Sequence, residues 1–150
     1  MGKNGSSFKK LHHVGVVVKD INKAIAYFES LGIGPFGGPD GKKAFPVAFK
    51  GELHGKPAEW TTTISNAKLG DVELEILEPT KGNQALKESL DATGEGLHHI
   101  GFITDNLEQE IANFKKNGIG IWTEAKGQFI YSDPSPVGGV AIEFRGMHKE

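Results

Sequence analysis

The chain has 150 residues, of which 37% are apolar and 24% are charged, a balance typical of a folded globular domain rather than a disordered segment. Its net charge of -2, from 17 basic and 19 acidic residues, argues against a nucleic-acid-binding surface. The absence of cysteine excludes disulfides, thiolate nucleophiles and cysteine-ligated metals, so a metal ion would need histidine, carboxylate or amide ligands.

The apolar segments of the chain are short. The longest strongly apolar stretch covers residues 14–18, far below the roughly 20 residues of a membrane-spanning helix. The opening segment MGKNGSSFKK lacks the apolar run of a signal peptide. We therefore expect a cytoplasmic protein with no membrane or nucleic-acid partner, folded as a single domain over residues 1–150.

Two segments of the chain are closely similar. Residues 11–34, LHHVGVVVKDINKAIAYFESLGIG, return as residues 97–120, LHHIGFITDNLEQEIANFKKNGIG, with ten of the 24 positions identical. A repeat of this kind indicates two copies of one supersecondary unit. Because the repeat includes a His-His pair, a fold unit and a set of candidate ligands were duplicated together.

The first module is expected over residues 9–81. Residues 11–18 are rich in β-branched side chains and predict a buried strand, whereas residues 21–30 have apolar positions at helical spacing. Asp20 stands where an N-cap is expected and Gly32 where the helix should end. Further strands are expected at residues 44–50, 61–67 and 70–76.

The second module is expected over residues 82–150 and begins with a short connecting helix at residues 84–92. Its remaining elements are a strand at 98–104, a helix at 107–116, and strands at 120–123, 128–132 and 138–144. Each module then has the order βαβββ. We predict an α+β fold built from two βαβββ modules.

The two modules differ in length. The segment GDVELEI at residues 70–76 matches GGVAIEF at residues 138–144. The distance along the chain between these two segments is 18 residues shorter than the distance between the two copies of the first repeat. The first module therefore holds 18 extra residues. We assign them to the Gly- and Pro-rich residues 35–60 and interpret them as a loop extension. A loop present in only one copy does not serve the shared core, so we expect it to cover a ligand site.

Alternation along the predicted strands decides which side chains can meet. His13 lies on the strand face opposite the valines that should contact the helix, and His99 has the same place in the second module. Glu75 and Glu143 lie opposite the apolar faces of the last strands. Two histidines and two glutamates suit a divalent ion such as Co, Ni, Zn, Mn or Fe(II). We predict one such ion, held by His13, Glu75, His99 and Glu143.

The other member of each His-His pair has the opposite parity. His12 and His98 are therefore expected to face the helices and to pack there rather than bind the metal. A lone histidine or glutamate in a strand is usually structural. The recurrence of both residue types at matched positions favours the metal interpretation.

The motifs around these residues resemble the vicinal oxygen chelate superfamily over residues 9–145. The segments that carry the resemblance are His13 before Val14 and Gly15, ELEILEP with Glu75, GEGLHHIGF with His99, and GGVAIEF with Glu143. Within the superfamily, ELEILEP followed by a short helix and GEGLHHI is most similar to the methylmalonyl-CoA epimerases. The resemblance implies a glyoxalase-like fold, in which the two βαβββ modules form one eight-stranded cupped sheet around a site for one divalent metal ion. It also implies that the protein is usually a homodimer.

For an epimerase, the resemblance implies that the 2-proton of an acyl-CoA thioester is removed and returned to the opposite face through a metal-stabilised enolate. We expect Glu143 to ligate the metal and assist proton transfer, and Glu59 to be the second acid-base candidate. Glu59 lies near the family's acidic position before the third strand, but the Gly-Val that follows this position in the family is absent here. Trp60 and the loop before it are therefore expected to reshape the pocket.

Two alternative functions remain open. A lactoylglutathione lyase of the glyoxalase I type uses the same order of His, Glu, His and Glu and also moves a proton. A metal-free small-molecule-binding protein of the bleomycin-resistance type would share the fold without the chemistry, although four intact metal-type residues disfavour it. An extradiol dioxygenase needs two histidines and one carboxylate, so Glu75 disfavours that activity.

Overall fold

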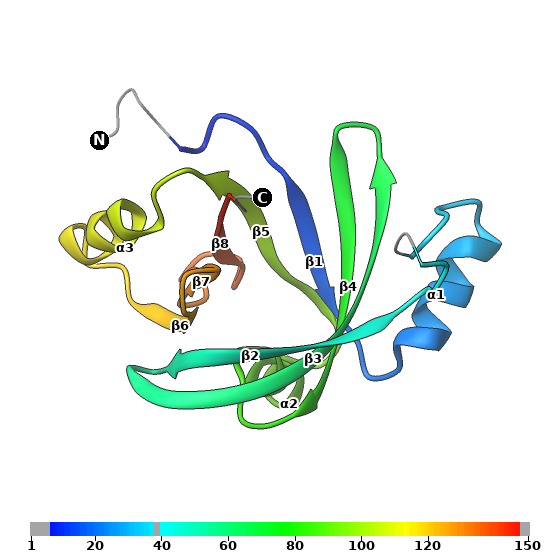
Figure 1. The fold of residues 1–150 in the computed structure, drawn as a ribbon, viewed down its shortest axis with the longest axis horizontal. Coiled ribbons are helices and arrows are strands. Elements are labelled where there is room, and N and C mark those ends of the chain that lie inside the picture. Colours follow the sequence, from blue (N-terminus) through cyan, green and yellow to red (C-terminus); the bar gives the residue numbers. More distant parts are fainter. Residues whose placement is uncertain (1–6, 38–39, 148–150) are drawn as a thin grey trace.

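The computed structural model describes residues 7–37 and 40–147, which form eight strands and three helices (Figure 1). In chain order the elements are β1 (His13–Val17), α1 (Ile21–Ser30), β2 (Phe45–Leu53), β3 (Lys56–Leu69), β4 (Val72–Lys81), α2 (Ala85–Thr93), β5 (Gly96–Thr104), α3 (Leu107–Lys116), β6 (Ile121–Ala125), β7 (Phe129–Ser132) and β8 (Ala141–Gly146). Each half of the chain thus has the order βαβββ, with α2 between the halves.

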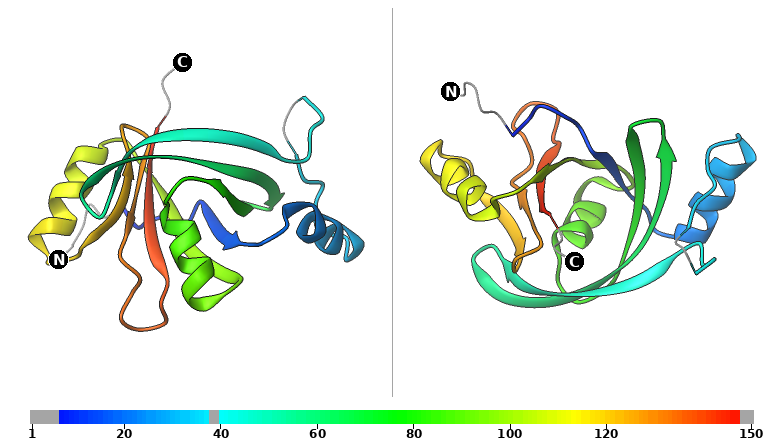
Figure 2. Two further views of the ribbon diagram at one scale, coloured as in Figure 1. Left: turned by 90° about the horizontal axis from the view of Figure 1, so that it is seen from below. Right: turned by 45° about the horizontal axis from the view of Figure 1, so that its top comes forward.

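The eight strands form one closed barrel in the order β1-β4-β3-β2-β6-β7-β8-β5. The two halves meet where β1 pairs with β5 and where β2 pairs with β6, both antiparallel. Helix α2 lies within the outline of the ring of strands in Figure 2, and its first residues belong to the core inside the barrel. This is the eight-stranded cupped sheet that the family resemblance implies.

Helices α1 and α3 lie on opposite sides of the barrel (Figure 1) and have the bounds that the sequence predicts. At the start of α1, the side chain of Asp20 accepts a hydrogen bond from the backbone N–H of Lys23. Asn106 accepts in the same way from the N–H of Gln109 at the start of α3. Each cap satisfies a backbone donor that the first helical turn leaves without a partner.

Strand alternation separates a core inside the barrel from two cores beneath the helices. On β1, Val17 belongs to the inner core, whereas Val14 and Val16 pack with α1 on the outside. The expectation that these outward valines contact the helix is confirmed. The outer core beneath α3 is built around Phe102, Phe114, Ile130 and Phe144.

The extra residues of the first module are mostly strand rather than loop. Strands β2 and β3 have nine and 14 residues, whereas their counterparts β6 and β7 have five and four. The strand expected at residues 44–50 is confirmed, whereas the loop extension expected within residues 35–60 is wrong from Gly51 onward, where β2 and β3 continue as strands. Residues His54 and Gly55, with positive φ angles of 52° and 77°, form the tight turn between the two strands.

Glycine in this stretch marks a close approach of two backbones. A Cβ atom at Gly51 would lie 1.9 Å from the backbone oxygen of Glu124, because β2 meets β6 at this point. Gly51, one of the glycines that suggested a loop, therefore reflects the closure of the barrel. The extra residues were expected to cover a ligand site. In the structure Phe45, Val47 and Phe49 of the long hairpin of β2 and β3 line a cavity.

The pairing of β1 with β5 brings the two repeated motifs together. His13 lies opposite Gly101, and Gly15 lies opposite His99. The parallel neighbours β4 and β8 then place one glutamate beside each glycine, with Glu75 next to Gly15 and Glu143 next to Gly101. Register alone thus gathers residues from four strands at one junction.

None of the helices in the described part of the chain is long and apolar enough to cross a membrane. The opening segment, on which the expected cytoplasmic location rests, lies outside the described residues over positions 1–6. That location therefore stays a prediction.

Candidate metal centre

Four of the five site residues predicted from the sequence lie together at this junction. His13, Glu75, His99 and Glu143 each offer one ligand atom, and the four atoms lie within 4.8 Å of one another. All four side chains are buried, and two come from each half of the chain. Glu59, the fifth predicted residue, is not part of this cluster.

The ligand atoms have spacings that a small divalent ion could occupy. The Nε2 atoms of His13 and His99 are 3.3 Å apart. Oε1 of Glu143 lies 2.6 Å from Nε2 of His13 and 3.0 Å from Nε2 of His99. Oε1 of Glu75 lies 3.6 and 3.4 Å from the same two nitrogens. Ligands held about 2 Å from a zinc-like ion are roughly 3 Å apart. The donor set of two nitrogens and two oxygens therefore fits a divalent metal.

Glycine makes room for each histidine ring. A Cβ atom at Gly15 would lie 2.2 Å from Cε1 of His99, and one at Gly101 would lie 2.0 Å from Cε1 of His13. Real Cβ atoms do not approach other atoms so closely, so each ring occupies space that only a glycine leaves open. The repeated glycine is thus a partner of the repeated histidine on the opposite strand.

His98 contacts the cluster indirectly, through the ring of His99. The two Nδ1 atoms are 2.9 Å apart, so His98 can accept a hydrogen bond that leaves Nε2 of His99 directed at the cluster. A bulge in the pairing makes this arrangement possible. His99 pairs with Gly15 and Leu97 with Val16, which leaves His98 as the extra residue.

The expectation that His98 faces a helix is wrong. Its ring centroid lies 5.2 Å from that of Trp122 and 5.0 Å from that of Tyr131, and both partners belong to the inner core. Burial, together with the charge of His99, lowers the pKa of His98 to about 3, so the ring is neutral. Its Nε2 atom has no hydrogen-bond partner among the described residues, which typically costs about 1–3 kcal/mol.

His12 repeats this arrangement in the first module. Its Nδ1 atom lies 2.8 Å from Nδ1 of His13, and the side chain is half-buried. His12 therefore contacts the ring of His13 as His98 contacts the ring of His99.

Nearby charges keep both glutamates of the cluster ionised. Burial raises the pKa of Glu143, but the charge of Arg145 and hydrogen bonds with His13 and His99 outweigh burial and hold that pKa well below its usual value. Burial also opposes ionisation of Glu75, yet the hydrogen bond with His99 and the charge of Arg145 lower its pKa. Ionised carboxylates are the form that binds a metal.

His99 is protonated in the metal-free cluster at neutral pH. Burial lowers the pKa of its imidazole, but hydrogen bonds with Glu143 and Glu75, and the charges of both, raise it to about 9. A metal ion at Nε2 must displace this proton, so metal binding and protonation are linked.

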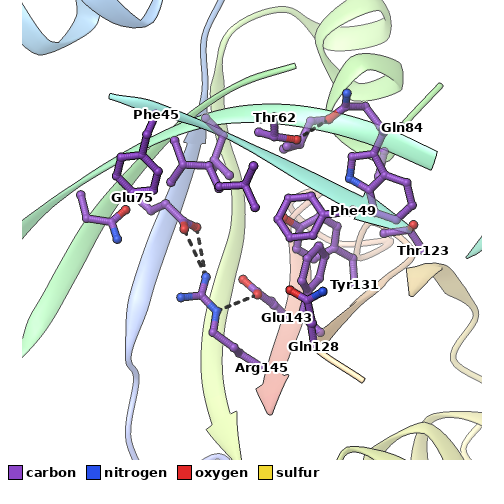
Figure 3. A pocket seen from close by; sticks show the side chains of 18 residues that line it. Phe45, Phe49, Thr62, Glu75, Gln84, Thr123, Gln128, Tyr131, Glu143 and Arg145 are labelled. Carbon is purple, nitrogen blue, oxygen red and sulfur yellow. Dashed lines mark hydrogen bonds and ion pairs between the residues drawn. The ribbon is translucent and has the colours of Figure 1, made fainter. Parts of the chain in front are cut away.

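Arg145 is a residue of the site that the sequence reasoning missed. It lies two positions after Glu143 on β8 and therefore on the same face of the strand. Its Nη2 donates to Oε2 of Glu75 at 3.2 Å, and its Nε donates to Oε2 of Glu143 at 3.3 Å (Figure 3). The sequence carried one signal, because Arg145 is the only arginine among its 17 basic residues.

A cavity of about 330 Å³ opens onto the cluster (Figure 3). Its walls are mostly aromatic and aliphatic, and the charged residues among those that line it are Glu75, Glu143 and Arg145. The apolar lining comprises Phe45, Val47, Phe49, Trp60, Ile64, Leu77, Ala85, Leu86, Phe129 and Tyr131. A small polar group could therefore meet the cluster while an apolar group contacts the walls.

Glu59 faces away from this cavity. Trp60, Thr62 and Ile64 of β3 line the cavity, so the intervening and preceding residues point to the other face of the strand, where Glu59 is exposed. The geometry therefore separates Glu59 from the cluster, contrary to the acid-base role expected for it. Trp60 does contribute to the cavity wall, as the sequence suggested.

Replacing Gly101 by alanine should displace the ring of His13 and weaken metal binding by about 10- to 100-fold, because the added Cβ would overlap that ring. Titration of the metal-free protein with zinc against a competing chelator measures the affinity, and circular dichroism checks folding. Gly146→Ala is the matched control, since its Cβ would meet only atoms at 3.6 Å. Unchanged affinity in folded Gly101→Ala would contradict the proposed packing.

The two histidines of β5 should separate in mutants. His99→Ala is expected to abolish tight metal binding because it removes a ligand, whereas His98→Phe keeps a ring in the core but removes the contact to Nδ1 of His99. The His98→Phe protein should remain folded and lose about 10- to 100-fold in zinc affinity. The zinc titration described above measures the affinity of both variants. If the His98→Phe protein binds zinc as tightly as the wild type, His98 serves only in packing.

Stability of the metal-free protein should fall as the pH rises. The pKa of His99 lies at about 9 in the folded protein and near 6.5 in the unfolded chain, so its contribution is complete below pH 6.5 and is lost by about pH 9. The loss should be roughly 3 kcal/mol. Glu75, Glu143, His98 and Tyr131 surround His99; burial raises the pKa of Tyr131 well above 10, so Tyr131 stays neutral in this range.

Urea unfolding with a chelator present, at pH 6 and pH 9, measures this change. Zinc affinity should show the opposite trend and strengthen over the same range, because fewer protons compete for His99. His99→Gln should flatten the dependence. A metal-free protein that is equally stable at both pH values would contradict the raised pKa.

Known proteins similar to this chain match most of its length. The protein YqjC of Bacillus subtilis is 26% identical over 141 residues, which cover 89% of each chain. The mitochondrial methylmalonyl-CoA epimerase of Bos taurus is 27% identical, and the match covers 89% of this chain and 72% of that protein.

Solved structures share the fold. The protein BH1468 of Bacillus halodurans has a TM-score of 0.63 at 24% identity, with 94% of this chain and 96% of that chain covered. Methylmalonyl-CoA epimerase of Mycobacterium tuberculosis has a TM-score of 0.63 at 16% identity, with 99% and 94% covered. Residues 12–131 match the model of the glyoxalase/bleomycin resistance protein/dioxygenase superfamily. The chain therefore belongs to the glyoxalase/bleomycin resistance protein/dioxygenase superfamily.

Proposed function

We propose that this protein is a metal-dependent isomerase that epimerises carbon 2 of an acyl-CoA thioester, in the manner of a methylmalonyl-CoA epimerase. The observation that carries the proposal is the convergence of four buried ligand atoms at the wall of a small, mostly apolar cavity. The similarity to the bovine epimerase over 89% of this chain supports it. A solved epimerase with a TM-score of 0.56 to this chain holds methylmalonyl-CoA.

In this proposal His13, Glu75, His99 and Glu143 hold one divalent ion, which is Co, Ni, Zn, Mn or Fe(II). Such an ion supplies positive charge that stabilises negative charge developing on a carbonyl oxygen. The ring contacts from His12 and His98 keep the two histidine Nε2 atoms directed inward. The aromatic walls exclude water and contact the acyl group.

Glu143 is the proposed proton acceptor. It lines the cavity, as Glu75 does from the other half of the chain, and Arg145 contacts both carboxylates (Figure 3). The proton on carbon 2 moves to a carboxylate oxygen of Glu143, and the electrons of the broken bond pass to the thioester carbonyl. Reprotonation of the opposite face by solvent inverts the centre, and Glu143 releases the proton that it accepted to solvent, so the net number of protons is unchanged.

Proton NMR in deuterated water tests the reaction. Incubation of metal-loaded protein with 2-substituted acyl-CoA esters should exchange the 2-proton for deuterium and racemise the centre. Glu143→Gln should slow exchange by about 100-fold or more, because general base catalysis contributes that much. Glu59→Gln should retain exchange, since Glu59 faces away from the cavity.

Other outcomes point to other functions. Absence of exchange with every thioester, together with turnover of a glutathione hemithioacetal, would reassign the protein to the lactoylglutathione lyase activity. Less than about 0.1 equivalent of bound metal after reconstitution would favour the metal-free binding protein, because a preformed site of this kind should bind tightly. A homodimer remains the expected assembly, and size-exclusion chromatography with light scattering tests it.

A further inference from the structure

Arg145 has a distinctive place in both the sequence and the cavity. All other basic residues of this chain are lysines, yet the single arginine lies beside the cluster, with 24% of its side chain exposed. Among the described residues that line the cavity, it is the only one with a positive charge. Arginine differs from lysine in offering a planar set of donors that matches a carboxylate.

The two oxygens of each glutamate have different neighbours. The Oε1 atoms lie nearest the histidines, whereas each Oε2 atom accepts a hydrogen bond from Arg145, whose Nη2 also donates to Oε1 of Glu75 at the longer distance of 3.4 Å. Nη2 of Arg145 also lies 3.4 Å from Nε2 of His13, at the border of the cluster. An ion at the Oε1 atoms would therefore leave the Oε2 atoms to Arg145, so that the guanidinium and the ion can be present together.

The guanidinium keeps a donor for another partner. Its contacts use Nε and Nη2, and Nη1 has no hydrogen bond to any residue in the described part of the chain. In Figure 3 the guanidinium is joined by dashed lines to both Glu75 and Glu143, at the wall of the cavity. An anion that enters the cavity can therefore reach a free N–H group of Arg145.

The charges of the site also favour an anion. Glu75 and Glu143 contribute two negative charges, which a divalent ion would balance. The charge of Arg145 would then remain uncompensated at the wall of a mostly apolar cavity, where electrostatic interactions are strong. A ligand with one negative charge next to the reacting carbon would restore neutrality.

We propose that Arg145 is the specificity-determining residue of this site, and that it binds a carboxylate group attached to the reacting carbon of the substrate. The inference rests on the proposed function and narrows its substrate class to 2-carboxyacyl compounds. The apolar walls take the short side chain on the same carbon. A neutral acyl group or hemithioacetal leaves Arg145 without an anionic partner and binds more weakly.

The single arginine also supplies the test, because a uniformly ¹⁵N-labelled sample contains one arginine Nε–H signal. Malonate and its dimethyl ester, which has no free carboxylate, serve as non-reacting probes of the protein, both metal-free and zinc-loaded. In the zinc-loaded wild type, malonate should shift the arginine signal saturably, while the ester should leave it nearly unchanged. Dissociation constants of both probes are then measured by calorimetry for wild type and variants.

Arg145→Gln should lose about tenfold or more of the preference for malonate over the ester, since a charge-assisted hydrogen bond is removed. Arg145→Lys should recover part of the preference. Lys116→Gln is the matched control, because it removes one positive charge from an exposed position on α3. Zinc affinity is also measured for every variant. If Arg145 acts only through its contacts with the two glutamates, its replacement would change zinc affinity but not the preference for malonate over the ester.

The outcomes separate the two proposals. A preference that is equal in wild type and Arg145→Gln, or an arginine signal that malonate does not shift, would overturn the role of Arg145. Failure of the wild type to bind zinc or any of the other four candidate ions would overturn the proposed function. In that case the response of the arginine signal to malonate in the metal-free protein still decides whether Arg145 binds a carboxylate.

Discussion

The contact on which this structure depends is the reciprocal packing of histidine on glycine across β1 and β5. Each ring occupies the space where the opposite glycine has no side chain, His13 over Gly101 and His99 over Gly15. The same contact joins the two halves of the barrel and directs two imidazoles into one space. Closure of the fold and assembly of the site are therefore one packing event, which explains why histidine and glycine recur together in the repeat.

Burial of two carboxylates at this junction requires compensating charge. An isolated buried carboxylate costs several kcal/mol, and partners with good geometry are needed to offset that cost. In the metal-free protein the partners are Arg145 and the protonated His99. Two positive charges thus balance the two glutamates. A metal ion can replace the proton of His99, whereas Arg145 lines the cavity.

The two halves of the chain contribute unequally beyond the cluster. Each supplies one histidine and one glutamate, but the long hairpin of β2 and β3 has no equal in the second half. That hairpin provides Phe45, Phe49 and Trp60 to the cavity, and α2 covers one end of the barrel. Duplication therefore accounts for the ligand set, and divergence of one copy accounts for the shape of the cavity.

The sequence by itself determined the order of elements, the two helices and the four residues of the cluster. Side-chain alternation in a strand has a period of two, so His13, Glu75, His99 and Glu143 could be assigned to one face from local pattern alone. The same rule misplaced His98, because a bulge shifts the register by one residue and no local signal announces it. Alternation places Glu59 and Trp60 on opposite faces of β3, so the sequence pattern already separates Glu59 from the cavity that Trp60 lines.

Only the tertiary structure decided how distant segments meet. The glycines of residues 35–60 indicated a loop, yet Gly51 is required because the backbone of β6 passes close to it. Arg145 was visible as the sole arginine, but its contact with both glutamates depends on β4 and β8 lying on either side of the paired β1 and β5. Local pattern fixes which face a side chain takes, whereas register and barrel closure fix its partners, and those arise from pairing between segments far apart in the chain.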